Sequence, residues 1–239
     1  MDICFFEELK RMCIENGFRR RGRAFFRIAG DGVLQVIKNE HQVRGYPHNL
    51  SIGLFSMYGE LRQQWFTSGG CIPRYSIVNL IGKKDPNLLI PSGSYYISSA
   101  ILLEEQLRIL KGTGFDWLNS ITTQEQLANG ICQLDALCYK NIIWNDLFKF
   151  EPFLCSGDLE SAAKVIDAIL SQHRSAVEIN CKHMSKADAE QHLLKMQEED
   201  RPLHRKLEMV HQADRSAIHS YLSENYARNC TYARFCTRK

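Results

Sequence analysis

Five arginines stand close together near the start of the chain: Arg19, Arg20, Arg21, Arg23 and Arg27. A guanidinium makes bidentate contacts with carboxylate or phosphate oxygens, and an aromatic side chain such as the intervening Phe25 can stack on a base. We therefore take Arg21, Arg23 and Arg27 as candidate contacts for an acidic ligand. The alternative is that the arginines only solvate the start of a strand. A net charge of +3 and one short basic cluster favour this alternative over a nucleic-acid footprint.

A second candidate group combines aromatic side chains with one further arginine: Trp65, Arg74, Tyr75, Tyr95 and Tyr96. These residues fall near the second half of the predicted sheet, where they would line a groove on a face that the helices leave uncovered. Aromatic residues more often pack as ordinary core and rim residues, which is the competing interpretation.

The sequence assigns no metal site. His211, Arg215 and His219 share one face of a helix, but two histidines eight residues apart are separated by about 12 Å of helix rise. They cannot share one ion unaided, so we interpret them as surface histidines and expect no metal.

No catalytic or cofactor-binding motif occurs in the sequence. Gly82 lacks a glycine five residues before it, and Lys84-Asp85 replaces the Lys-Ser/Thr of a phosphate loop. Neither a G-x-S-x-G nor an H-E-x-x-H motif is found. We assign no catalytic residue and no cofactor, although a cysteine and a histidine distant in the sequence can still meet in space as a nucleophile pair.

The composition indicates a cytoplasmic protein. Nine cysteines, an odd number without a C-x-x-C pair, are typical of small buried hydrophobic residues in a reducing compartment. No apolar run reaches the roughly 18 residues that a membrane span needs. The N-terminal segment carries acidic residues and has no signal-peptide cleavage site, so we expect no membrane partner.

The arginine cluster must be positioned by the elements around it. The apolar spacing predicts a helix from about Asp2 to Asn16, which Gly17 ends in a left-handed conformation while Phe18 folds back on the last turn. Alternation predicts a strand over 23–28, and Gly30-Asp31-Gly32 predicts a hairpin turn to a second strand over 33–37.

Three further strands are predicted over 50–55, 75–81 and 95–99. From residue 100 the apolar period changes to that of helices. We expect the first of these to end at Gly112 or Gly114 and the next to begin with a capping box of Thr122 and Glu125.

The remaining chain is also predicted to be helical. Asp158 and Ser185 each cap the start of a helix, and a new helix begins near Pro202. Residues 228–239 are expected to be basic and loosely ordered. Together these elements predict an α+β fold with an antiparallel sheet of four to five strands, helices packed on one side, and a C-terminal helical extension. The domains would be 1–180 and 181–239.

The helix that closes on Gly17-Phe18, the run from Arg21 to Arg27 and the segment from Gly30 to Val36 resemble the bacterial domain-of-unknown-function 4304 family. Phe115 to Leu118, followed by Thr122 to Leu127, is similar to its second half, so the resemblance covers residues 1 to about 175. The chain departs from the family at Tyr95-Tyr96, in place of a tryptophan-rich strand, and from about residue 181. The resemblance implies an antiparallel sheet with helices against it, and no reaction.

We therefore expect a non-enzymatic binding or interaction module. Its partner would be an unidentified protein or acidic ligand, recognised through the open sheet face and the arginine-bearing hairpin, with nucleic acid not expected. One alternative is a small hydrolase or nucleic-acid-processing enzyme with residues gathered from separate elements. The other is a structural homo-oligomer assembled through residues 181–239.

Overall fold

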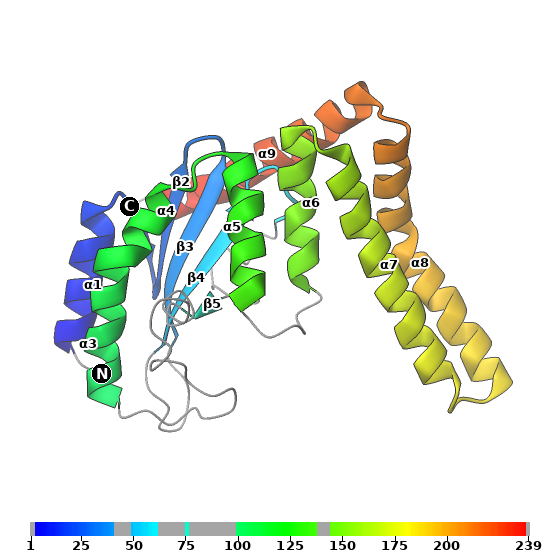
Figure 1. The fold of residues 1–239 in the computed structure, drawn as a ribbon, viewed down its shortest axis with the longest axis horizontal. Helices are drawn as coiled ribbons and strands as arrows, with labels where there is room; N and C mark the ends of the chain where they lie inside the picture. The colour runs from blue at the N-terminus through cyan, green and yellow to red at the C-terminus, as the bar shows by residue number, and fades with distance from the viewer. Residues whose placement is uncertain (1–2, 41–48, 62–74, 77–98, 138–143, 238–239) are drawn as a thin grey trace.

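The chain folds into an antiparallel sheet with helices around it (Figure 1), and the computed structural model describes residues 3–40, 49–61, 75–76, 99–137 and 144–237. The strands are β1 (Arg19–Arg21), β2 (Ala24–Ala29), β3 (Val33–Glu40), β4 (Asn49–Ser56) and β5 (Tyr75–Ser76). The helical elements are α1 (Ile3–Glu15), α3 (Ser99–Ile109), the π-helical turn η3 (Leu110–Gly114), α4 (Phe115–Asn119), α5 (Gln124–Leu137), α6 (Trp144–Ser156), α7 (Leu159–Cys181), α8 (Lys186–His211) and α9 (Arg215–Thr237).

The strands cross the sheet in chain order, each antiparallel to the next. The predicted hairpin at Gly30-Asp31-Gly32 joins β2 to β3, and the predicted third strand is β4. Both turn glycines have positive φ angles, as the hairpin requires. Of the strand predicted over 75–81, Tyr75 and Ser76 form β5 and the rest lies outside the described residues. Residues 95–98 also lie outside them, and Ser99 begins α3 instead of ending a strand.

The arginine run itself forms a strand, which the sequence pattern did not indicate. Arg19–Arg21 is β1, the edge strand of the sheet, and Arg21 pairs with Ala24 across the two-residue turn. Gly22 has a φ of +58°, the left-handed conformation that lets the chain reverse within two residues.

The end of α1 confirms the predicted glycine stop. Gly17 has a φ of +78°, and its N–H donates to the carbonyl of Ile14 at 3.0 Å. The N–H of Phe18 donates to the carbonyl of Cys13 at 2.9 Å, which completes a Schellman motif. This motif turns the buried Phe18 ring back into the core beside α1.

One face of the sheet packs against α1 and the helical segment from α3 to α5. Phe25, Ile37 and Ile52 point to this face, and their side chains join a core with residues such as Leu9 of α1 and Leu118 of α4. Figure 1 shows these helices in front of the sheet. The buried residues on this face alternate along each strand, as expected for a sheet with a defined core side.

The opposite face is covered as well, so the expectation of helices on one side only does not hold. Phe26, Leu34 and Val36 point to this second face and pack in one cluster with Tyr226 and Ala233 of α9. In Figure 1 this C-terminal helix passes behind the strands. The physical reason is that the strands bury apolar side chains on both faces, so the second face also needs a cover. The α+β class, the antiparallel sheet and the C-terminal helices are as predicted.

Helices α6 to α9 share a third cluster, which includes Phe150 of α6, Ile166 of α7, Leu207 of α8 and Ile218 of α9. The predicted cap at Asp158 is confirmed, since its side chain accepts from the N–H of Ser161 at 3.0 Å. Beyond this cluster α7 and α8 continue as a two-helix hairpin that projects from the rest of the fold (Figure 1).

Two predicted features in the middle of the chain are shifted. The helix expected to end at Gly112 or Gly114 continues through η3 into α4 and ends at Asn119. The capping box lies one residue later than predicted: Thr123 accepts from the N–H of Gln126 at 3.2 Å, and Gln126 accepts from that of Thr123 at 3.0 Å. Either pair satisfies the sequence pattern, and the structure uses the later one.

Two predictions for the C-terminal part are wrong. The chain does not begin a new helix at Pro202, because α8 runs unbroken from Lys186 to His211 with the proline inside it. Residues 228–237 are not loosely ordered, because they form the last turns of α9. The cap predicted at Ser185 is confirmed, with its hydroxyl accepting from the N–H of Asp188 at 3.3 Å. Since α9 covers the sheet, the segment predicted as an extension contributes to the core of the fold.

Candidate functional site

The structure separates Arg27 from the other candidate arginines. Its Nη1 donates to the carbonyl of Asn16 at 2.8 Å and its Nε to Oε1 of Gln35 at 3.0 Å. The guanidinium also lies 4.5 Å from the centroid of the Phe18 ring. Partial burial lowers the pKa of Arg27, yet a guanidinium stays protonated in proteins. Arg27 therefore joins the end of α1 to the sheet, and we withdraw it as a ligand contact.

Gln35 extends this polar contact into the core, a role that the sequence analysis did not assign to it. Its side chain is buried, and Nε2 donates to the carbonyls of Leu118 at 2.7 Å and Ile121 at 2.9 Å. Because the same amide accepts from Arg27, one side chain ties β3 to β2 and to the turn between α4 and α5. A glutamine in an apolar strand pattern was the available signal.

The remaining arginines lie on β1 and its turn. Arg20 is held against Phe6, with its guanidinium 4.6 Å from the ring centroid and its Nε donating to the carbonyl of Gly22 at 2.9 Å. Arg19 and Arg21 pair across the ladder with Phe26 and Ala24, so they share the sheet face that α9 covers. Arg19 and Arg23 are exposed, and neither forms an ion pair with any described residue.

The second candidate group is largely outside the described residues. Trp65, Arg74, Tyr95 and Tyr96 all lie there. Tyr75 is in β5, where it pairs with Ile52 at the other edge of the sheet from β1. The structure thus does not bring Tyr75 together with the arginines of β1.

The last turns of α9 lie near β1, which places two basic segments side by side. Helix α9 starts against α6 to α8, crosses the second sheet face and contacts β1. Residues 19–23 contain four arginines and no acid, and residues 228–237 contain two arginines and no acid. Of 30 basic and 27 acidic residues in the chain, these segments hold six basic ones and no acidic one. We call Arg19–Arg23 together with residues 228–237 the basic face.

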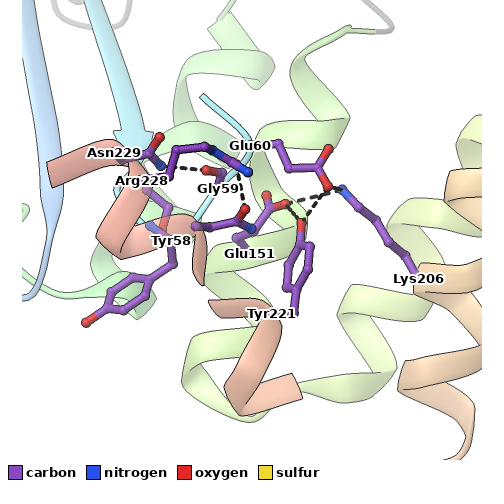
Figure 2. Close-up of polar contacts among 10 residues, drawn as sticks. Tyr58, Gly59, Glu60, Glu151, Lys206, Tyr221, Arg228 and Asn229 are labelled. Atoms are coloured by element: carbon purple, nitrogen blue, oxygen red, sulfur yellow. Dashed lines mark hydrogen bonds and ion pairs between the residues drawn. The ribbon is translucent and has the colours of Figure 1, made fainter. Parts of the chain in front are cut away.

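Polar contacts fix α9 on the second sheet face (Figure 2). Asn229 is buried, and its Nδ2 donates to the carbonyls of Met57 at 2.8 Å and Gly59 at 2.6 Å, just beyond β4. The rings of Tyr58 and Tyr226 stack with centroids 4.9 Å apart. These contacts set the position of α9 along the sheet, and with it the position of its basic end.

A buried carboxylate lies where α9 enters this contact. Glu151 of α6 is 5% exposed, and its Oε1 accepts from the hydroxyl of Tyr221 of α9 at 2.6 Å. Nζ of Lys206 of α8 lies 3.5 Å from the same oxygen and 3.3 Å from Oε1 of Glu60. Figure 2 shows these side chains converging from three helices and the segment after β4. We call Glu60, Glu151, Lys206 and Tyr221 the Glu151 cluster.

Burial dominates the electrostatics of this cluster. It raises the pKa of Glu151, although Lys206 and the Tyr221 hydroxyl act in the opposite direction. Burial also raises the pKa of Tyr221, helped by the two carboxylates. The pKa of the nearby Cys155 thiol is raised to about 12, first by burial and then by the charges of Glu151 and Asp31. The thiol is therefore a poor nucleophile at neutral pH.

One buried amide atom of α9, Oδ1 of Asn229, has no hydrogen-bond partner among the described residues. Asn225 accepts from Nη2 of Arg228 at 2.5 Å through its Oδ1, and its side chain also hydrogen-bonds to Tyr221. A buried polar atom without a hydrogen bond costs free energy, so the packing of α9 is not fully optimised.

The described residues contain no cluster of three or more histidine, cysteine, aspartate or glutamate side chains that could hold a metal ion. Among them there is also no helix with both the length and the apolar character needed to cross a membrane. His211 and His219 lie on different helices, α8 and α9, instead of on one helical face as the sequence suggested.

Comparisons of the chain with protein-family models, with curated proteins and with solved structures found no match. The resemblance to the domain-of-unknown-function 4304 family therefore stays a prediction.

Proposed function

We propose that the chain is a cytoplasmic binding module that recognises an acidic segment of another protein through its basic face. The observation that carries this proposal is the meeting of β1 with the end of α9, two segments without a single acidic residue. The basic face holds six arginines, which leaves 24 basic and 27 acidic residues in the rest of the chain, so the charge is asymmetric. Such asymmetry attracts a partner of opposite charge and orients it during encounter.

The chemistry of the arginine hairpin favours carboxylates over nucleic-acid bases. Single-stranded nucleic acids are bound by exposed aromatic rings that stack on the bases. The rings of Phe25 and Phe26 are buried in the two cores, and Phe6 lies against Arg20. Exposed guanidiniums such as those of Arg19 and Arg23 remain suited to bidentate contacts with carboxylates.

The cytoplasmic part of the proposal is supported by the cysteines. Cys13, Cys155, Cys181 and Cys230 are free thiols, which fits a compartment that keeps thiols reduced.

A poly-glutamate peptide with a fluorescent label is a direct probe of the basic face. We expect the full chain to bind it at low salt, with an affinity that falls as salt is raised. The double variant Arg19→Glu/Arg23→Glu should bind roughly tenfold more weakly or worse, because each reversal replaces an attraction by a repulsion.

The matched control is Arg174→Glu/Arg201→Glu, which makes the same change of charge at exposed positions on α7 and α8. If both double variants lose the same affinity, only net charge matters and the basic face is not a site. Tighter binding to single-stranded DNA than to poly-glutamate, through the same arginines, would replace the acidic-protein proposal by a nucleic-acid one.

The enzyme alternative has less support. Glu151, Lys206 and Tyr221 are titratable groups within reach of one another, as an active site gathered from separate elements requires. However, Glu151 is 5% exposed and the Lys206 side chain 11% exposed, and the reactive atoms are occupied by one another. This arrangement favours a structural role in holding the helices together.

A second function, self-association, is favoured by a separate observation on the α7–α8 hairpin. Ile179, Met184, Leu193 and Leu194 are large exposed apolar residues, all at the projecting end of this hairpin. Two of the six exposed large apolar residues described, Ile14 and Ile28, lie elsewhere. The projecting end of the hairpin carries charges of both signs, including Lys182, Lys186, Asp188 and Glu190. A second copy can therefore approach it without like-charge repulsion. We propose that a second copy of this chain packs against these exposed apolar residues.

A further inference from the structure

Helix α9 is held at its start by the Glu151 cluster and along its length by the sheet. Tyr221, the residue that donates to Glu151, lies two turns into α9, before the helix reaches the strands. Eight residues later Asn229 makes the contacts with the carbonyls of Met57 and Gly59. The Glu151 cluster is thus the polar contact at the point where α9 passes from the other helices onto the sheet.

We propose that the Glu151 cluster is a latch whose protonation state sets how firmly α9 is docked on the sheet. This inference rests on the proposed function for its consequence: undocking would move the basic end of α9 away from β1 and take the basic face apart. The same movement would expose the apolar side chains of Phe26, Leu34 and Val36.

The sign of the effect follows from the environment of Glu151. In the docked state burial raises its pKa above the ordinary value of 4.5. In the undocked state water reaches the carboxyl and the pKa returns toward that value. Between the two pKa values the docked state holds a proton that the undocked state has lost. Docking is therefore strongest below about pH 4.5 and weakens as pH rises through this interval.

The described titratable groups that face Glu151 come from four parts of the chain. Lys206 of α8 and the hydroxyl of Tyr221 of α9 favour the carboxylate. Glu60, after β4, opposes it. Cys155 of α6 is near enough to feel the charge of Glu151, but burial raises the pKa of this thiol to about 12 and keeps it neutral over the relevant range. The proton that moves in this interval is therefore the one on Glu151.

The remaining contacts of α9 make undocking accessible. The unpartnered Oδ1 of Asn229 would gain a hydrogen bond with water on undocking. The buried carboxylate would gain solvation as well. The free energy of these interactions with water offsets part of the free energy lost when the apolar contacts of α9 separate. The stability of the docked state therefore depends on the protonation state of the Glu151 cluster.

Hydrogen exchange of α9, measured by mass spectrometry on the full chain and corrected for the intrinsic rate at each pH, tests the latch. We expect the protection of α9 peptides to fall with rising pH, by up to about tenfold per pH unit within the interval. In Glu151→Gln, which keeps the shape and carries no titrating proton, this fall should disappear, while α1 peptides behave alike in both proteins. The same pH dependence of α9 in both proteins would overturn the proposal.

Tyr221→Phe provides a second variant should Glu151→Gln fail to fold. It removes a hydrogen bond that lowers the pKa of Glu151, so the pKa rises further and the fall in α9 protection should extend to higher pH than in the native chain. A fall that ends at the same pH in both chains would contradict the latch.

Addition of the poly-glutamate peptide separates the latch from the proposed function. A ligand that bridges β1 and α9 must increase the protection of α9, because binding and docking are linked. A chain that binds the peptide without any change in α9 protection would overturn the coupling between latch and site. A chain that does not bind the peptide would overturn the proposed function, while the pH dependence of α9 still decides the latch.

Discussion

The hydroxyl of Tyr221 lies 2.6 Å from Oε1 of Glu151, although the two residues are 70 positions apart in the sequence. This hydrogen bond joins α9 to α6, where Glu151 is buried and Tyr221 is half-buried. A hydrogen bond to a buried carboxyl group is worth more than one at the surface, because its loss leaves a polar group without a partner. Its removal should therefore lower the stability of the fold measurably.

Replacing Tyr221 by Phe should lower the free energy of unfolding by about 1–3 kcal/mol. The ring, whose centroid lies 6.3 Å from that of Phe150, is kept, so the loss measures the hydroxyl and not the packing. Urea denaturation at neutral pH gives the value. Ser220→Ala is the control, because it removes an exposed hydrogen bond to Glu224 on the same helix and should change stability by less than about 0.5 kcal/mol. Equal losses of unfolding free energy in the two variants would show that the Tyr221 hydrogen bond stabilises the fold no more than an exposed one.

Strands β2, β3 and β4 were predictable because local patterns determine them. The Gly30-Asp31-Gly32 turn and the alternation in β4 depend only on neighbouring residues, and both were found where expected. The strand character of Arg19–Arg21 was missed, because three arginines lack the β-branched and aromatic residues that indicate strands. Its pairing with β2 is imposed by Gly22, which turns the chain back on itself.

Arg27→Lys should lower the free energy of unfolding by roughly 1–2 kcal/mol, whereas Arg23→Lys should leave it unchanged within about 0.5 kcal/mol. A lysine cannot contact the carbonyl of Asn16 and the amide of Gln35 at once while stacking on Phe18, because it lacks the planar, forked guanidinium. Arg23 is exposed and has no such contacts among the described residues. Thermal or urea unfolding of both variants measures the difference. A stable Arg27→Lys chain would return Arg27 to the candidate ligand contacts.

Replacing Gly22 or Gly30 by alanine should lower the free energy of unfolding by different amounts. The difference separates the cost of backbone strain from the cost of steric crowding. Both have positive φ angles, so alanine at either position costs about 1 kcal/mol from conformation alone. At Gly22 an added Cβ meets nothing within 4 Å, but at Gly30 it would clash with the carbonyl oxygen of Thr122. That carbonyl accepts from the N–H of Asp31 at 2.7 Å, so the contact with the loop before α5 would also be lost.

We therefore expect Gly30→Ala to be destabilised by at least about 2 kcal/mol more than Gly22→Ala in urea denaturation. Similar losses at the two positions would mean that the hairpin and the loop before α5 move apart easily.

The placement of α9 could not be predicted from the sequence for a physical reason. Its apolar residues follow only a weak stripe, since the helix divides them between the helical cluster at its start and the sheet at its end. Glu151 gave no signal either. A lone glutamate between apolar residues acquires its role only when Lys206 and Tyr221, distant in the sequence, are folded against it.

The last prediction concerns self-association through the α7–α8 hairpin. The exposed fractions of Ile179 and Leu194 are 61% and 64%, and pairing with a second copy would remove both side chains from water. Light scattering of the native chain should give twice the monomer mass of 27.6 kDa at high concentration. Ile179→Glu/Leu194→Glu should give the monomer mass with an unchanged circular dichroism spectrum, because a glutamate on each helix of the hairpin places like charges in the apolar contact. Gln172→Glu/Gln191→Glu adds the same charge at exposed polar positions of the same helices and should still dimerise. A native chain that stays monomeric at every concentration, or a control that dissociates equally, would remove the hairpin as a contact between copies.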